Sequence, residues 1–204
     1  MRNDIRPATP IFGVVLENLG TPAAPTARAL RSFLRQFLGD PRVVDLPRWR
    51  WRPVLELFIL PFRPRRSARL YRTIWTAEGS PLLVTTRRIG RAVATSLSET
   101  LGSEIPVAVG MRYGSPSLAE ALFELEHRGC SRILVLPLFP QYSATTTASV
   151  FDAVFAELAT RRVVPELRTV RSYAAHPAYV AALAYEQLAA KYPKGRSHSA
   201  TWAR

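Results

Sequence analysis

The sequence is poor in cysteine, in lysine and in long apolar runs. Its one cysteine, Cys130, excludes an internal disulfide framework, a four-cysteine zinc site and a cysteine-ligated iron–sulfur cluster held by a single chain. Every apolar run is far shorter than the ~20 residues that cross a bilayer, and no apolar signal region follows Met1, so we expect a cytoplasmic location. The motifs Gly-x-Gly-x-x-Gly, after the first predicted strand, and Gly-x-x-x-x-Gly-Lys do not occur, which argues against dinucleotide and phosphate-loop sites.

What the sequence does contain is enough apolar material for a core and a large excess of arginine. The 204 residues are 48% apolar and 21% charged, which indicates one folded domain, or one domain and part of a second. The net charge is +13, and 26 of the 28 basic residues are arginine. Arginine presents a planar fork that suits carboxylates and phosphates, so the charge suggests an anionic partner, although codon composition alone also produces such a bias.

More than half of this excess lies in residues 48–72, which hold eight arginines and one acid, Glu56. The apolar run 55–62 (LELFILPF) lies within this segment and follows Trp49 and Trp51. Apolar side chains flanked by arginine are typical of a membrane-surface segment or of the lip of an apolar pocket that takes an acidic ligand. A buried helix with solvated arginines at its ends fits the same pattern.

Hydrophobic periodicity predicts strands alternating with helices. We expect strands over 11–16, 106–111, 131–138 and 167–170, and helices over 25–38, 82–101, 116–128, 147–159 and 177–191. This order predicts an α/β fold with an open, mostly parallel twisted sheet and flanking helices. One domain would span 11–191, between an N-terminal tail (1–10) and an atypical C-terminal tail (192–204).

Ligands of such folds bind beyond the carboxyl ends of the strands. The loops expected at that edge contribute a set of polar side chains: Asn18, Thr21, Arg112, Tyr113, Gln141, Tyr142 and Ser143. Two of the turns also have simpler interpretations, in which Ser80 caps the helix that Pro81 begins, and Pro116 starts the following helix. The segment 137–147 is harder to explain as a plain turn, because two prolines stiffen it and several hydroxyl side chains follow Tyr142.

Five segments, in order and spacing, resemble the ferrochelatase family. They are 16–22 (LENLGTP), 37–43 (FLGDPRV), 71–75 (YRTIW) with 79–82 (GSPL), 111–114 (MRYG) and 136–143 (LPLFPQYS). The resemblance spans residues 11 to about 190 and implies the first lobe of a two-lobed chelatase fold. It also implies a lyase that inserts Fe2+ into a porphyrin, protoporphyrin IX or coproporphyrin, in haem biosynthesis.

The resemblance further implies roles for individual residues. Residues 55–62 would form a mobile lip over the porphyrin, and the substrate contacts would be Arg63, Tyr71, Ser80, Arg112, Tyr113, Tyr142 and Ser143. Fe2+ would be a substrate, with no permanently bound cofactor and no iron–sulfur cluster. Peripheral membrane contact through 49–66 is compatible with this function.

Metallation needs a base for two pyrrole protons and a bent macrocycle. In the family the base and the groups on the metal side are a histidine, in a Ser-x-His-Gly motif, and a later glutamate. Neither residue is identifiable in this sequence. We expect structural roles for His127 and His176, and the surroundings of His198 do not match the motif. The second lobe is also missing, so we expect either a fragment or a reading frame lost near Lys194, and no metal insertion by this chain alone.

Two other functions fit part of the sequence. A non-catalytic porphyrin- or haem-binding module fits the same residues without the missing base. Nucleic-acid binding fits the net charge of +13, but no nucleic-acid motif is present and the arginines surround an apolar run rather than a polar helix. We therefore expect a porphyrin partner and no nucleic acid.

Overall fold

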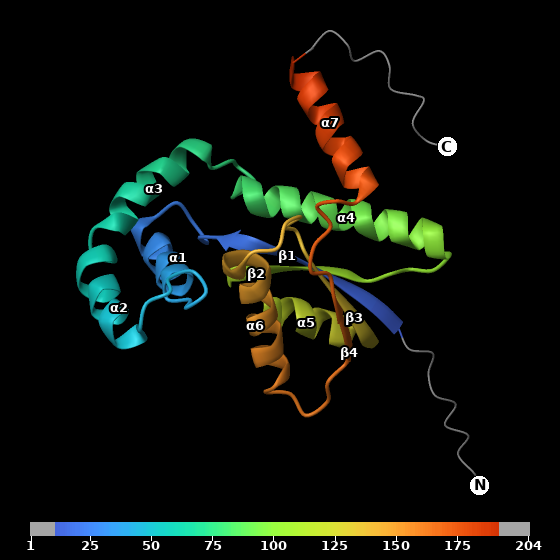
Figure 1. Cartoon of the computed structure of the whole chain (residues 1–204), viewed down its shortest axis with the longest axis horizontal. Helices are drawn as coiled ribbons and strands as arrows, with labels where there is room; N and C mark the ends of the chain where they lie inside the picture. The colour runs from blue at the N-terminus through green and yellow to red at the C-terminus, as the bar shows by residue number, and fades with distance from the viewer. Residues whose placement is uncertain (1–10, 192–204) are drawn as a thin grey trace. The chain divides into compact units, whose positions relative to one another are not determined.

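The computed structural model of the chain describes residues 11–191. It divides into two compact units, Met1–Arg171 and Ser172–Arg204, and this boundary falls inside the 11–191 domain expected from the sequence. Within the described part, the second unit contains one helix, α7 (Pro177–Lys191), and all the strands belong to the first unit (Figure 1).

The first unit is built on four strands: β1 (Ile11–Thr21), β2 (Val107–Gly114), β3 (Cys130–Pro137) and β4 (Glu166–Thr169). Their order in the sheet is β2-β1-β3-β4, and every neighbouring pair is parallel. In register, Val14 lies opposite Val107 of β2 and Val15 lies opposite Val135 of β3. This arrangement confirms the predicted α/β class and the open parallel sheet.

Helices cover both faces of this sheet because successive side chains of a strand point to opposite faces. Val14 and Leu16 pack with Val93 and Leu97 of α4 (Pro81–Leu101) on one face. On the opposite face Val15 packs with apolar residues of α5 (Leu118–His127) and α6 (Ser149–Leu158). Figure 1 shows α4 on one side of the strands and α5 and α6 on the other.

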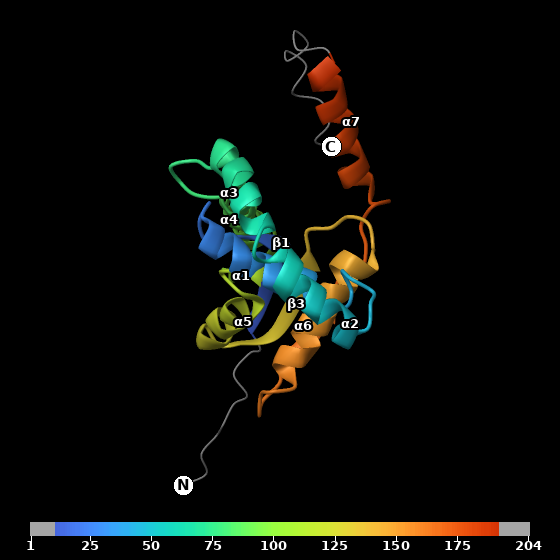
Figure 2. The same ribbon diagram turned by 90° about the vertical axis from the view of Figure 1, so that its left-hand side faces the viewer.

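The remaining helices gather beyond the carboxyl ends of the strands. They are α1 (Ala27–Leu38), α2 (Arg48–Val54), the π-helical turn η1 (Leu55–Ile59) and α3 (Arg63–Ile74). In Figure 1 the α2–α3 segment curves around α1, and Figure 2 shows the same segment from that end. No helix within residues 11–191 combines the length and the apolar character needed to span a membrane.

The structure separates the two interpretations of the basic and apolar segment. Leu55 and Leu60 are buried in a cluster with Leu30 and Leu34 of α1, as a core helix requires. The other large apolar residues of the segment remain in solvent: Trp49 71%, Leu57 64%, Phe58 67% and Phe62 72% exposed. The segment is therefore helical but only partly buried, and it presents both apolar and arginine side chains to solvent.

Several element boundaries differ from the prediction; β2, for example, ends at Gly114 and not at residue 111, so Arg112 and Tyr113 lie in the strand and not in a loop. Strand β1 continues to Thr21 instead of ending at residue 16, because its last residues pair with the end of β2. The close approach requires glycine at position 20, where φ is 107° and a Cβ would lie 1.8 Å from the carbonyl oxygen of Tyr113. Helix α5 begins at Leu118 and not at Pro116, because Ser117 and Glu120 form a capping box.

Candidate functional site

The centre of the site is a buried carboxylate, Asp40, which follows α1 directly. One of its oxygens accepts hydrogen bonds from Arg112 Nη2 at 2.6 Å, from the Tyr113 hydroxyl at 2.7 Å and from the Ser149 hydroxyl at 2.5 Å. Its other oxygen accepts the backbone N–H of Arg42 at 2.7 Å. The Arg112 Nε also donates to the carbonyl and hydroxyl of Ser149, so this guanidinium is held between Asp40 and the start of α6.

These contacts fix the charge state of the network. Burial acts to raise the pKa of Asp40, but the hydrogen bonds from Ser149, Tyr113 and the Arg42 N–H, together with the charge of Arg112, leave that pKa below its usual value. Burial raises the pKa of Tyr113 to about 12; the Ser149 hydrogen bond lowers it and the Asp40 hydrogen bond raises it. At neutral pH the network therefore contains an ionised Asp40, a charged Arg112 and a neutral phenol.

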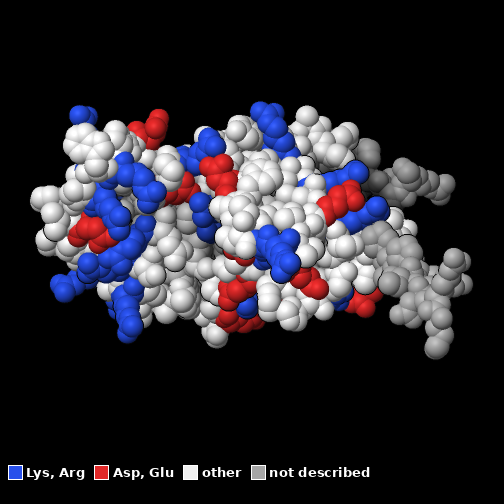
Figure 3. Space-filling view, turned by 90° about the horizontal axis from the view of Figure 1, so that it is seen from below, with Lys and Arg blue, Asp and Glu red and all other residues white. Residues whose placement is uncertain are grey.

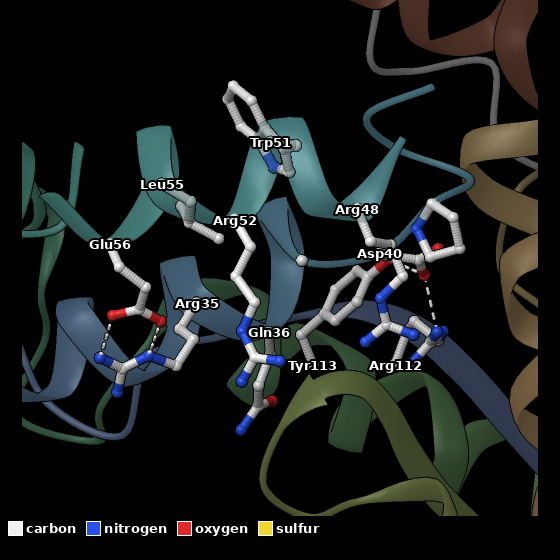
Figure 4. Close-up of a pocket in the computed structure, with 12 residues that line it drawn as sticks. Arg35, Gln36, Asp40, Arg48, Trp51, Arg52, Leu55, Glu56, Arg112 and Tyr113 are labelled. Atoms are coloured by element: carbon white, nitrogen blue, oxygen red, sulfur yellow. Dashed lines mark hydrogen bonds and ion pairs between the residues drawn. The ribbon is translucent and has the colours of Figure 1, made fainter. Parts of the chain in front are cut away.

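Arg112 and Tyr113 line a cavity of about 560 Å3 beside this network. Its wall comes from α1, the loop after α1, α2 and η1, and the residues include Arg35, Gln36, Arg48, Trp51, Arg52, Leu55 and Glu56. Figure 4 shows the side chains that surround the space. The cavity thus combines several guanidinium groups with an indole and a leucine.

The loop after β3 places Tyr142 and Ser143 outside the residues that line this cavity. The ring of Tyr142 is 43% exposed and lies under the guanidinium of Arg171, 4.3 Å from the ring centroid. The Ser143 hydroxyl lies 3.0 Å from the hydroxyl of Thr145 and 2.8 Å from that of Thr146. Tyr142 therefore offers an aromatic ring to solvent, whereas the hydroxyl of Ser143 already has partners in its own loop.

Ser80 occupies the N-cap position of α4, but the expected capping bond is absent. Its buried hydroxyl instead accepts a hydrogen bond from the Thr21 hydroxyl at 2.8 Å. This correction follows from the longer β1, which brings Thr21 to the start of α4. The neighbouring Asn18 donates to the Thr86 hydroxyl of the same helix at 3.0 Å, so both predicted loop residues tie the strand to α4.

Arg63 and Tyr71 lie on α3 and do not line the cavity of Arg112 and Tyr113. Arg63 is exposed and lines a second cavity of about 560 Å3 together with Phe58, Phe62 and Arg66. Tyr71 packs against the α1 cluster, and burial raises the pKa of its hydroxyl. The structure therefore distributes the predicted substrate residues over separate places: Arg112 with Tyr113, the Tyr142 loop, Ser80 with Thr21, and α3.

Sequence analysis missed three residues of this edge. Asp40 lies in the motif 37–43 but is not among the predicted site residues, although an acid directly after an apolar helix, in a chain with few acids, is an available signal. Ser149 gave no signal, because it lies inside a predicted helix. Glu17 was assigned to a loop, but it lies in β1 with no exposed surface, and neither carboxylate oxygen has a hydrogen-bond partner. Burial raises the pKa of Glu17 well above its ordinary value, and the charge of Arg112 only partly opposes this.

The histidines add no metal or proton-transfer cluster within residues 11–191. His127 ends α5, as expected, and its ring contacts that of Phe123 at a tilt of 43°, with centroids 4.0 Å apart. His176 precedes α7, and His198 lies outside the described residues. No group of three or more histidine, cysteine, aspartate or glutamate side chains in the described part of the chain is placed to hold a metal ion. Cys130 is buried in the core beside α5.

Comparisons with known proteins agree with the motifs. The sequence model of the family described as Ferrochelatase matches residues 12–199. Ferrochelatase 1 of Shewanella oneidensis is 52% identical over 177 residues, which cover 87% of this chain and 53% of that protein. The ferrochelatase of Edwardsiella ictaluri is 54% identical over 171 residues, 84% of this chain and 52% of the relative. The chain thus spans about half the length of the curated relatives it matches.

Proposed function

Because the chain belongs to the ferrochelatase family, we propose that its first unit forms one wall of the porphyrin site of an enzyme that inserts Fe2+ into a porphyrin in haem biosynthesis. A porphyrin is a flat apolar disc with carboxylates on one edge, so its site needs an apolar surface beside cations. The observation that carries the proposal is the surface of η1 and α3. There Leu57, Phe58 and Phe62 are more than half exposed next to the arginines of α3.

The cations of this surface are available to a ligand. Arg63 and Arg66 line the cavity with Phe58 and Phe62, and neither forms an ion pair or hydrogen bond within the described chain. Two guanidiniums beside two aromatic rings suit a planar apolar ligand with carboxylates at its rim. We assign the carboxylate edge of the porphyrin to this cavity. Tyr71 lies on the same helix as the two arginines.

The polar network would form the wall that faces the macrocycle. Arg112 is held in place by Asp40 and Ser149, and Tyr142 presents an aromatic ring at the same edge of the sheet. Ser80 can reach a substrate carboxylate only if its hydroxyl leaves Thr21. Fe2+ enters this scheme as a substrate, without a permanently bound cofactor or an iron–sulfur cluster.

We also propose that the 204-residue chain alone binds porphyrin without inserting iron. Metal insertion requires a base that accepts two pyrrole protons. Asp40 is a weak base because its pKa is lowered, and the neutral phenol of Tyr113 holds its proton to about pH 12. The histidine and glutamate that the family uses have no identified counterpart in this sequence.

A fluorescence titration of porphyrin against the chain tests both statements. We expect saturable quenching, weakened about tenfold by the R63A/R66A double variant, since charge-assisted hydrogen bonds to carboxylates are lost. The matched control is R87A, which removes an exposed charge from α4 and should leave the affinity unchanged. Absence of saturable binding would overturn the proposed site, and metal insertion at a native rate would overturn the proposed inactivity of the chain alone.

A non-catalytic porphyrin- or haem-binding module is the second candidate, and the same apolar and arginine-rich cavity favours it. A complementation experiment distinguishes the two candidates. The chain is mixed with the part of the Edwardsiella ictaluri ferrochelatase that it does not match. Restored insertion of Fe2+, followed by absorbance, favours the enzyme. Binding without insertion in the mixture favours the module.

We propose in addition peripheral contact with a membrane surface through residues 49–66. Trp49, Phe58 and Phe62 are exposed, and the surrounding arginines suit anionic headgroups. Flotation with anionic vesicles should recover the wild-type chain, and replacing the three aromatic residues by serine should abolish recovery. The cytoplasmic location and the exclusion of nucleic acid stay predictions, and an affinity for DNA that falls steeply with salt would contradict the second.

A further inference from the structure

The cavity between α1 and α2 carries charges that the porphyrin site does not use. Arg48 and Arg52 lie four residues apart on α2, so their side chains share one face of the helix. In Figure 4 Arg48 extends from α2 toward Arg112, and Arg52 extends toward Gln36. Neither the side chain of Arg48 nor that of Arg52 forms an ion pair or hydrogen bond with another residue of the described chain.

The two acids of this cavity already have partners. Glu56 forms a bidentate pair with Arg35, with distances of 2.8 and 2.7 Å between nitrogen and oxygen atoms. This hydrogen-bonded pair is the main reason that the pKa of Glu56 is lowered, and the charge of Arg52 adds to it. Asp40 is held by the buried network. The lining therefore has four arginines and two committed acids, which leaves a net charge of +2.

Other donors and an apolar wall complete the cavity. Gln36 accepts the backbone N–H of Gly114 with its side-chain oxygen at 3.0 Å, which leaves its amide NH2 group to donate. Trp51 and Leu55 supply the apolar part of the lining. Figure 3 shows basic side chains gathered at one end of the molecule. Arg48 and Arg52 are both exposed.

We propose that this cavity is a binding site for a small dianion, a phosphate group or a dicarboxylate, separate from the porphyrin surface on α3. Two unpaired guanidinium forks and a free amide match the oxygens of such a ligand, and its two charges neutralise the excess of the lining. The site shares no lining residue with the cavity of Arg63 and Arg66. Arg112 and Tyr113, which we assign to the wall facing the macrocycle, also line the dianion site, so the two sites lie next to each other.

Calorimetry with inorganic phosphate and with succinate, at constant ionic strength, tests the site on the 204-residue chain. We expect saturable binding of one ligand per chain, weakened about tenfold by R48A or R52A, because each substitution removes a charge-assisted contact. The matched control is R50A, on the same helix, whose guanidinium instead lies over the Trp49 ring at 4.7 Å from the centroid. A gain is expected from E56Q, which releases Arg35 and should tighten phosphate binding a few-fold.

Three outcomes would overturn the proposal. Equal weakening by R48A, R50A and R52A would mean diffuse attraction and no site. Displacement of phosphate by porphyrin would mean that the cavity takes the porphyrin carboxylates. If the chain binds neither the free dianions nor vesicles that carry phosphate-monoester lipid headgroups, the cavity is not an anion site. If such vesicles bind through Arg48 and Arg52 while free phosphate does not, the phosphate group comes from a lipid, and the proposed chemistry stands.

Discussion

Asp40 and Glu17 are two buried carboxyl groups near the same guanidinium, that of Arg112, and they differ in their hydrogen bonds and in the direction of their pKa shifts. Asp40 accepts four hydrogen bonds, whereas the two oxygens of Glu17 accept none. Their pKa values consequently move in opposite directions: the donors hold the pKa of Asp40 below its ordinary value despite burial, and burial raises that of Glu17. The comparison teaches that the donors around a buried acid, and not its depth, decide whether it carries a charge.

The largest expected effect is on the satisfied acid. D40N should lower the free energy of unfolding by about 3–5 kcal/mol, because it leaves the Arg112 charge without its buried partner. Urea unfolding measures this loss. The matched control is D45N, which changes an exposed acid five residues later and should leave the stability unchanged. An equal loss in both variants would contradict the special role of Asp40.

The pH dependence of the same variant sharpens the result. Since the folded pKa of Asp40 lies below its ordinary value of 3.8, its stabilisation is present above that value and is lost as the pH falls through the folded pKa. The stability difference between the wild type and D40N should therefore be constant from pH 5 to 7 and shrink below about pH 4. A difference that grows on acidification would reverse the assigned sign.

For the unsatisfied acid the expected change has the opposite sign. E17L should raise the free energy of unfolding at neutral pH by about 1–3 kcal/mol, because it removes a buried polar group without partners. The folded pKa of Glu17 lies above its ordinary value of 4.5, so the wild type loses stability as the pH rises past 4.5. The gain from E17L should accordingly be larger at pH 8 than at pH 4.

E17Q separates ionisation from burial at this position. It keeps the unpartnered polar group but cannot ionise, so its stability relative to the wild type should rise with pH while staying below that of E17L. Denaturant titrations at pH 4, 6 and 8 give all three curves. Parallel curves for the wild type and E17Q would mean that Glu17 has the same pKa in the folded and unfolded protein, which would contradict the raised pKa.

A neutral hydrogen bond at the same edge should have a smaller effect. S80A removes the acceptor of the Thr21 hydroxyl and should cost about 1 kcal/mol. The double variant T21V/S80A, which removes both hydroxyls, should recover part of this loss, because no buried hydroxyl is left unpaired. A loss for the double variant equal to the sum of the single losses would contradict a direct bond.

An exposed ion pair should have the smallest effect. Arg132 of β3 lies opposite Glu166 of β4 in register, with 2.8 Å between Nε and Oε2, and both side chains are about half exposed. E166Q should cost at most about 1 kcal/mol, and 0.5 M NaCl should remove much of the difference. A cost as large as that of D40N would break the link between burial and the strength of these pairs.

The sequence predicted the parts of the fold that depend on local patterns. The aliphatic run of β3 and the apolar periodicity of α1 indicated their elements, and the rule for parallel sheets brought Arg112 and Tyr113 to the correct edge. Family motifs marked residues 37–43, but nothing in them identified Asp40 as the acceptor for side chains more than 70 positions away.

Long-range packing determined what the sequence did not predict. The partner of Ser80 is 59 residues away, on a strand whose last residues look like a turn, so capping was the more natural interpretation. Glutamate is a residue type that is common in loops, and Glu17 is buried because β2 and β3 pair on either side of it. The assignment of Arg63, Tyr71, Tyr142 and Ser143 to substrate stays a prediction.

The strand order also bears on how the chain is made. Strand β1 lies in the middle of the sheet, yet Val14 pairs with Val107, and its other neighbour, β3, begins at Cys130. On the ribosome this apolar strand emerges with both edges unpaired and waits for at least 93 further residues, roughly 5–20 s at ordinary rates of synthesis. The nascent first half of the chain is therefore a natural client for a holding chaperone.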